Sequence, residues 1–124
     1  MKNISRIGSI KRNQKTSLIR REVGRLLAQA SLDYPELRGI ILTRVELSAD
    51  KSIAKILLYT PDGAATFTKK LEFLKLFAPS LRKALATAIS GRYAPQVRFV
   101  FDKTFEKQAH IEALLDKISS EFPS

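Results

Sequence analysis

The sequence predicts an α+β fold in which a three-stranded sheet carries its helices on one face. Three observations lead to this fold class. Residues 40–48 and 52–60 are rich in β-branched residues and are separated by a short polar turn, which is typical of an antiparallel hairpin. Apolar residues recur at helical spacing before and after the hairpin. A third strand-like segment follows, and because two strands alone are marginal in water, we expect it to join the hairpin.

The first helix is expected to end near Leu32, before Asp33-Tyr34-Pro35. Gly24 lies inside it and costs about 1 kcal/mol relative to Ala, so we expect another element to pack closely over that point. In the strand that follows, alternation places every second residue on the core face. The expected core residues of the helix are Leu18, Ile19, Val23, Leu26, Leu27 and Ala30, and those of the strand are Ile41, Thr43, Val45 and Leu47.

A helix break is expected at Phe77, Ala78 and Pro79. Proline lacks an N–H and its ring crowds the preceding turn, but it suits the first position of a new helix. The sequence therefore predicts two helices, then a strand, then a last amphipathic helix. The expected apolar residues of the first of these helices are Phe67, Leu71, Leu74 and Phe77, and those of the second are Leu81, Ala84, Leu85, Ala88 and Ile89. Those of the strand are Val97, Phe99 and Phe101, and those of the last helix are Ile111, Leu114, Leu115 and Ile118.

The length of 124 residues and the hydrophobic content of 44% fit one core. We expect a flexible basic N-terminal tail over 1–12, a single domain over 13–120 and a short tail over 121–124. The chain has no cysteine, which excludes disulfides and thiolate metal sites and favours an intracellular protein. It has neither an apolar run long enough to span a membrane nor an N-terminus suited to secretion.

The net charge of +10 favours a polyanionic partner. The excess is confined to two segments: 1–25 has eight Lys and Arg against one Glu, and 66–98 has seven against one. Such clustering is the expected footprint of nucleic-acid binding, whereas membrane binding is disfavoured because the first helix has no Trp or Phe anchor. Arg44 and Lys55 are expected to pair with Glu46 instead. The candidate RNA-binding residues are Arg21, Arg25, Lys75, Arg82, Lys83, Arg92 and Arg98.

Catalysis is not expected. His110 is the only histidine, the carboxylates are dispersed and the glycines are isolated, so no acid–base pair, metal site or phosphate loop is indicated. We therefore predict a non-enzymatic protein without cofactor, metal or small-molecule substrate. Phe67, Phe77, Phe99 and Phe101 fall on core faces, which leaves Tyr59 and Tyr93 as candidates for stacking on bases and favours recognition of shape and phosphates.

A helix, a tight turn and a second helix beside a strand form the core of KH-type RNA-binding modules, although this chain lacks their Gly-x-x-Gly loop. Over roughly Lys11 to Ile118 the sequence resembles the ribosome-binding factor A family. The matching motifs, in order, are Arg44-Val45-Glu46-Leu47-Ser48-x-Asp50 with Ala54, Leu81-Arg82-x-x-Leu85, Ala94-Pro95-Gln96-Val97-Arg98-Phe99 with Asp102, and Ile111-Glu112-x-Leu114-Leu115.

This resemblance implies a type II KH-like fold with a three-stranded mixed sheet, and a cytoplasmic assembly factor. Such a factor binds the small (30S) ribosomal subunit, aids late maturation and processing of 16S rRNA and matters for growth in the cold. We expect it to act as a monomer. The family's break is usually Ala-x-Gly, so Phe77-Ala78-Pro79 is a departure that stiffens the joint and removes a backbone donor. The alternative is a general KH-like RNA-binding protein or RNA chaperone that is not dedicated to the ribosome.

Overall fold

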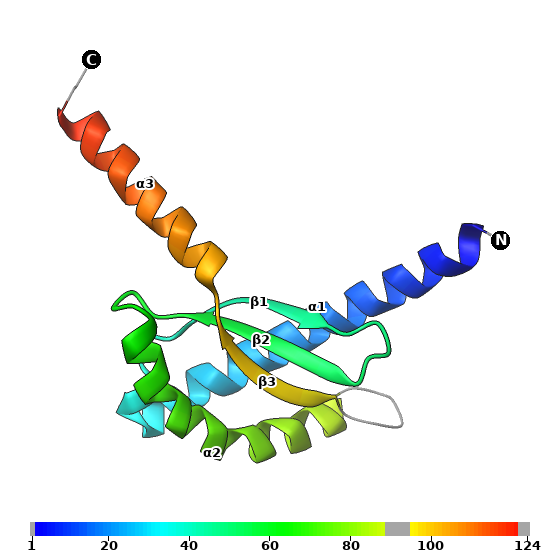
Figure 1. Ribbon diagram of the computed structural model, residues 1–124. Helices are drawn as coiled ribbons and strands as arrows, with labels where there is room; N and C mark the ends of the chain where they lie inside the picture. The colour runs from blue at the N-terminus through cyan, green and yellow to red at the C-terminus, as the bar shows by residue number, and fades with distance from the viewer. Residues whose placement is uncertain (1, 89–94, 122–124) are drawn as a thin grey trace.

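The computed structural model describes the backbone of residues 2–13 and all atoms of residues 14–88 and 95–121. A long helix leads into a hairpin, and a second helix leads into a third strand and a last helix (Figure 1). The elements are α1 (Lys2–Asp33), the 3-10 turn η1 (Pro35–Leu37), β1 (Ile41–Leu47), β2 (Ile53–Tyr59), α2 (Ala64–Ala88), β3 (Gln96–Phe101) and α3 (Lys103–Glu121).

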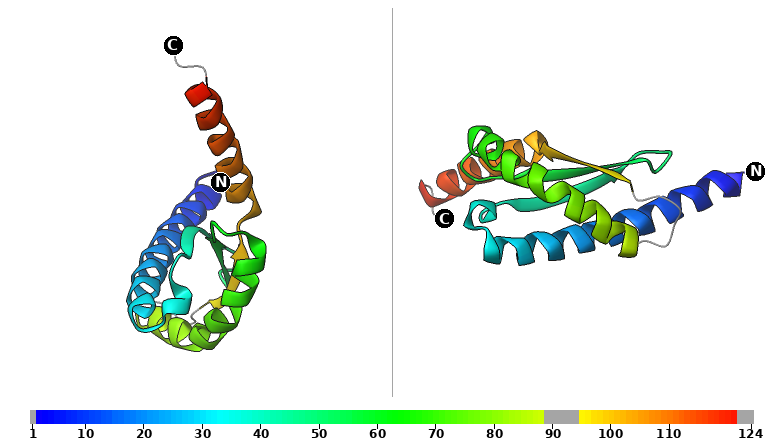
Figure 2. Two further views of the ribbon diagram at one scale, coloured as in Figure 1. Left: turned by 90° about the vertical axis from the view of Figure 1, so that its left-hand side faces the viewer. Right: turned by 90° about the horizontal axis from the view of Figure 1, so that it is seen from below.

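The sheet has the order β1-β2-β3. β1 pairs antiparallel with β2, and β2 pairs parallel with β3, so the predicted mixed sheet is confirmed. The crossover from β2 to β3 passes through α2, as parallel neighbours require. Figure 2 shows α1 and α2 on the same side of the sheet, which leaves the other face of the sheet without a helical layer. The α+β class predicted from the sequence is therefore confirmed.

The hairpin turn is held by the Asp50 carboxylate. Its Oδ1 accepts hydrogen bonds from Ser52 Oγ (2.7 Å), Ser52 N (3.1 Å) and Ser48 Oγ (2.7 Å). These bonds, led by the one from the Ser52 hydroxyl, lower the pKa of the Asp50 carboxyl to about 2. Lys51 adopts a left-handed conformation with φ of 62° to close the turn. The turn thus fixes the register of β1 against β2.

A β-bulge makes β1 depart from the regular alternation of inward and outward residues that the sequence predicts. The register shifts between Leu42 and Arg44, which leaves Thr43 as the extra residue. Leu42 therefore packs against the core together with Val45, and Ile41, expected inside, is 43% exposed. Sequence alternation cannot reveal this because one inserted residue reverses the facing of everything on one side of it.

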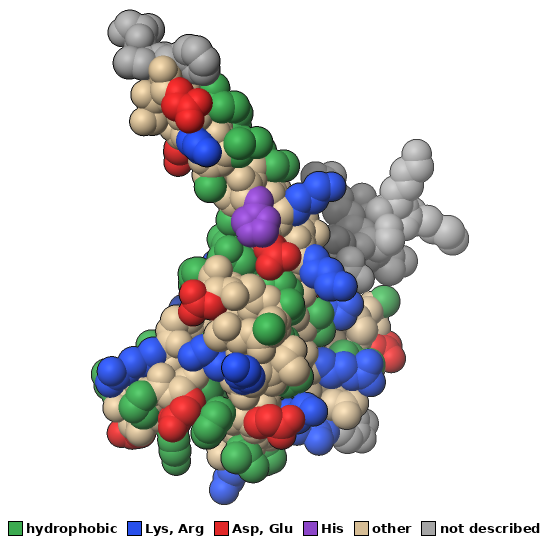
Figure 3. All heavy atoms as spheres, turned by 60° about the vertical axis from the view of Figure 1, so that its left-hand side comes forward, with side chains coloured by type: hydrophobic (Ala, Val, Ile, Leu, Met, Phe, Trp, Pro, Cys, Tyr) green, Lys and Arg blue, Asp and Glu red, His purple; other side chains and the backbone are tan. Residues whose placement is uncertain are grey.

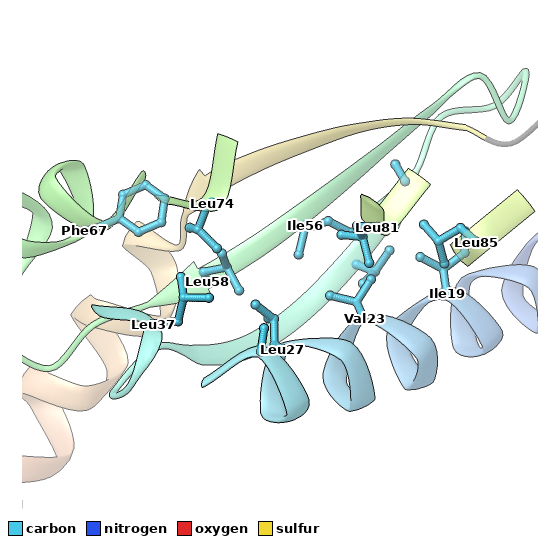
Figure 4. Packing of buried hydrophobic residues seen from close by; sticks show 13 residues of the cluster. Ile19, Val23, Leu27, Leu37, Ile56, Leu58, Phe67, Leu74, Leu81 and Leu85 are labelled. Atoms are coloured by element: carbon cyan, nitrogen blue, oxygen red, sulfur yellow. The ribbon is translucent and has the colours of Figure 1, made fainter. Parts of the chain in front are cut away.

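The core lies between the sheet and the two long helices (Figure 4). Leu81 and Leu85 of α2 approach Val23 and Ile19 of α1, and all four side chains are fully buried. At the other end, Phe67 and Leu74 of α2 and Leu37 of η1 cover the sheet. Most residues of the helical stripes predicted for α1 and α2 pack here, but Ala88 is exposed and Ile89 lies outside the described residues. The remaining buried members are Leu27, Ala30, Val45, Ala54, Ile56 and Leu58.

The expected helix break at Phe77, Ala78 and Pro79 is a bend within one helix. α2 is continuous and contains Pro79 in its interior. Figure 1 shows α2 descending along its first part and then running below the sheet. A kink is the expected effect of a missing N–H and of the ring's clash with the carbonyl one turn earlier. The helix continues because Leu74 and Leu81, on either side of the proline, are both fully buried against the sheet.

Both ends of the chain also differ from expectation. Residues 2–12, expected as a loose tail, are helical and continuous with α1. This segment contains no proline, so nothing in its backbone stops a helix from propagating. α3 was expected to pack with the other helices, but it projects away from them (Figure 1). Its apolar residues lie along one side of the helix (Figure 3) and are 45–58% exposed: Ile111, Leu114, Leu115 and Ile118.

Candidate nucleic-acid interface

A cationic groove lies between α2 and the start of β3. It measures about 550 Å³ and is lined by Lys75, Ala78, Pro79, Arg82, Lys83, Ala86, Gln96 and Val97. Lys75 and Arg82 are two helical turns apart on α2, so their side chains project from the same side of the helix, and Lys83 adjoins Arg82. All three cations are exposed, and none of the described lining residues is acidic.

The floor of this groove is apolar and small. Ala78 and Ala86 project little from α2, and Val97 of β3 packs partly against the core. Side chains this short leave the backbone of α2 open to a bulky ligand. Pro79, inside α2, falls in the same stretch. The groove therefore combines three flexible cations with a shallow surface, which suits the phosphate and sugar backbone of a nucleic acid better than a small metabolite.

A second cationic site lies between α1 and β1, and we call it the β1-edge hollow. It measures about 460 Å³ and is lined by Ser17, Arg20, Arg21, Gly24, Arg25 and Leu42. Arg25 Nη2 donates to Glu22 Oε2 over 2.9 Å, but its side chain stays 58% exposed. Arg21 and Arg25 were predicted from the sequence as RNA-binding residues but Arg20 was not, although Arg20 directly follows the buried Ile19 and is exposed.

The two cationic sites lie at opposite edges of the sheet. The groove takes its strand residues from β3, whereas the only strand residue of the β1-edge hollow is Leu42 of β1, and β2 runs between these strands. The two sites lie at the same height along the helix axes. The stretches of α1 and α2 that line them pack side by side in the core, where Leu85 lies near Ile19 and Leu81 near Val23 (Figure 4). In the structure, Arg21 and Arg25 therefore lie apart from Lys75, Arg82 and Lys83.

Two further candidate residues fall elsewhere. Arg98 follows Val97 on β3 and pairs in register with Lys55, so strand alternation places it on the face of the sheet that the helices leave open. Arg92 lies outside the described residues, as does Tyr93. Tyr59 is only 7% exposed, because its ring packs against Phe101 and Phe105 at centroid distances of 5.9 and 4.8 Å. Tyr59 is therefore a packing residue and not a platform for bases.

The open face also carries a small ion-pair network. Arg44 Nη1 lies 3.4 Å from Glu46 Oε1 on the same strand, and Lys55 Nζ lies 3.9 Å from Glu46 Oε2 across the hairpin, so both expected pairings with Glu46 are confirmed. Arg44 Nε also approaches Asp102 Oδ2 at 3.4 Å. The acidic residues here neutralise part of the charge. We therefore regard the open face as a weaker candidate for phosphate binding than the groove.

Among the described residues no three His, Cys, Asp or Glu side chains gather as a metal ion would require. Within the same residues, no helix combines the length and apolar character needed to cross a bilayer.

Comparison with known proteins places the chain in a family. The family model "Ribosome-binding factor A" matches residues 11–115. A ribosome-binding factor A from Vesicomyosocius okutanii is 37% identical over 82% of this chain and 86% of its own length. One from Methylocella silvestris is 34% identical over 79% of this chain and 64% of its own length.

A solved structure supports the fold. The crystal structure of ribosome-binding factor A from Thermus thermophilus is similar with a TM-score of 0.52 at 21% sequence identity, covering 72% of this chain and 89% of that one. At this identity the likeness concerns the fold alone. The match of the family model over most of the sequence, together with the relative from Vesicomyosocius okutanii, shows that this chain belongs to the ribosome-binding factor A family.

Proposed function

We propose that this chain is a non-enzymatic assembly factor that binds the small (30S) ribosomal subunit in the cytoplasm, as a monomer, and aids late maturation of 16S rRNA, including during growth in the cold. Membership of a family named for ribosome binding supports a ribosomal partner. The observation that carries the RNA-binding part is the groove between α2 and β3, whose described lining residues include three cations and no acid around a shallow apolar floor.

The mechanism follows from the groove's chemistry. Arg82 donates paired N–H groups to phosphate oxygens, and Lys75 and Lys83 act as mobile point charges. Each neutralised phosphate releases counterions, so three contacts to single-stranded RNA give a slope of about −2 for log K against log salt. Arg21 and Arg25 add a second anchor in this proposal, and Arg92 and Arg98 remain proposed contacts. Recognition depends on backbone shape and not on base edges.

Sedimentation of cell extract through a sucrose gradient tests this function. We expect the wild-type protein to travel with free small subunits and to leave them when salt is raised. The double variant Arg82→Glu/Lys83→Glu should lose this co-migration while keeping its thermal unfolding midpoint, because both side chains are exposed. The matched control is Lys107→Glu/Lys117→Glu on α3, which removes the same charge from exposed positions outside the groove.

Two results would count against the proposal. If the groove variant still co-migrates with small subunits, the binding face lies elsewhere. If the wild-type protein binds mature subunits, free RNA and duplex DNA with equal affinity, the chain is a general RNA-binding protein or chaperone rather than a dedicated assembly factor.

A further inference from the structure

We propose that the β1-edge hollow is an independent binding site for an RNA backbone, so that one copy of this protein holds two separate RNA segments, one at each edge of its sheet. The inference rests on the proposed function, because the groove between α2 and β3 supplies the first segment's site. It goes further in giving the protein a second, simultaneous ligand of the same chemical class.

The residues of the β1-edge hollow suit phosphate. Arg20, Arg21 and Arg25 bring three guanidinium groups, each with a rigid fork of donors, to one depression, and Ser17 adds a hydroxyl. The Arg25–Glu22 pair is a single exposed contact between residues three apart on a helix. Such pairs contribute little to stability, so Arg25 is able to exchange this partner for a phosphate at small cost.

Gly24 supports a binding role for the same depression. It lies in α1 beside these arginines and lines the hollow. A Cβ built at Gly24 would lie 3.7 Å from Leu42 Cδ2, which is an ordinary contact, so the packing of β1 does not require glycine here. Glycine inside a helix nevertheless costs about 1 kcal/mol relative to Ala. Its effect at this position is to keep the floor of the hollow clear of a side chain.

The geometry separates this site from the groove. The helix layer lies between them, and each helix with its side chains is about 10 Å wide. The groove opens at the β3 edge and the hollow at the β1 edge, at the same level along the helices. A single strand could reach both only by passing around α1 and α2 or across the open face of the sheet. Two segments, each approaching its own edge, need no such path.

A bridging experiment tests the inference. One pool of a short single-stranded RNA oligonucleotide carries a fluorescence donor and a second pool an acceptor, and the full-length protein is added to their mixture. We expect energy transfer with the wild-type protein, and light scattering should show one protein copy per complex. Arg20→Glu/Arg21→Glu and Arg82→Glu/Lys83→Glu should each abolish energy transfer but still bind one RNA. Lys107→Glu/Lys117→Glu should bridge like the wild type.

A second variant separates shape from charge. Gly24→Gln keeps every arginine and the net charge, replaces a poor helix former with a good one, and places a side chain in the hollow. It should raise the thermal unfolding midpoint and lower energy transfer while the groove still binds RNA.

The possible failures are distinguishable. If wild-type protein binds RNA but never brings two molecules together, or if bridging requires a protein dimer, the inference is overturned and the proposed function stands. If no RNA binds to the wild-type protein, both are overturned.

Discussion

The hydroxyl of Thr43 donates a hydrogen bond of 2.6 Å to Asp102 Oδ2, which ties the bulge of β1 to the start of α3. Asp102 is 3% exposed, and its other oxygen accepts the Phe105 N–H at 2.9 Å, so the same side chain caps α3. Burial raises the pKa of the Asp102 carboxyl, but the bonds from Thr43 and Phe105 and the nearby Arg44 guanidinium outweigh burial and lower it.

Replacing Asp102 should therefore cost more than the loss of an ordinary helix cap. We expect Asp102→Ala to lower the free energy of unfolding by about 2–3 kcal/mol, since it removes a cap and leaves the Thr43 hydroxyl without its charged partner. Urea denaturation measures the loss, and amide chemical shifts report whether α3 frays. Asp116→Ala, at an exposed position of α3, serves as the control and should change little. An unchanged urea midpoint for Asp102→Ala would contradict the role given to this residue.

The Asp50 turn predicts how stability depends on pH. The pKa of Asp50 is about 2 in the folded protein against an ordinary value of 3.8, so the unfolded chain takes up the proton first as pH falls. The stabilisation is fully present above 3.8 and is lost as pH falls toward 2. Asp102, whose pKa is also lowered, acts in the same direction. Thermal midpoints across this pH range should fall less steeply in Asp50→Asn than in the wild type. Parallel curves would show that the Asp50 carboxylate does not contribute to the pH dependence of stability.

Lys51 offers a position at which glycine should stabilise the protein. Its φ of 62° is unfavourable for a residue with a Cβ, and glycine avoids that penalty at some cost in unfolded-state entropy. We expect Lys51→Gly to raise the free energy of unfolding by about 0.5–1 kcal/mol. Ala49→Gly, in the same turn, is the matched control and should lower it, because Ala49 has no positive φ to relieve. If both variants shift in the same direction, backbone strain at Lys51 is not the cause.

The contrast between α2 and α3 is testable by truncating one leucine in each. Leu85 is fully buried and Leu114 is 58% exposed, although both lie on apolar helical stripes. Leu85→Ala should cost about 2–5 kcal/mol through lost burial and the cavity left behind. Leu114→Ala should cost less than about 0.5 kcal/mol, as surface substitutions do. Chemical denaturation of the two variants measures the difference, and an equal cost would mean that α3 packs against the domain.

The sequence predicted the sheet and the core stripes because burial imposes periods of two and of 3.6 residues. It failed at Thr43, since a single bulged residue shifts the facing of a strand without altering its composition. It failed at α3, because periodicity reveals an apolar stripe but not what the stripe packs against. The separation of Arg21 from Arg82 was also hidden, because only tertiary structure places two helices at opposite edges of one sheet.

Pro79 is expected to affect both the stability of α2 and the shape of the cationic groove. It sits inside α2, where proline removes a backbone hydrogen bond, yet its ring is exposed and lines the cationic groove. Pro79→Ala restores the donor to the helix and should raise the free energy of unfolding by about 1–3 kcal/mol, less than the full proline penalty because the core is already fitted to the bend. Ser80→Ala, the neighbouring exposed position, is the control for helix propensity alone.

A straighter α2 should also weaken RNA binding, because the groove loses its shape while Lys75, Arg82 and Lys83 are unchanged. Urea denaturation and RNA titration of one protein preparation test both effects, and a variant that is no more stable than the wild type would show that α2 requires its bend.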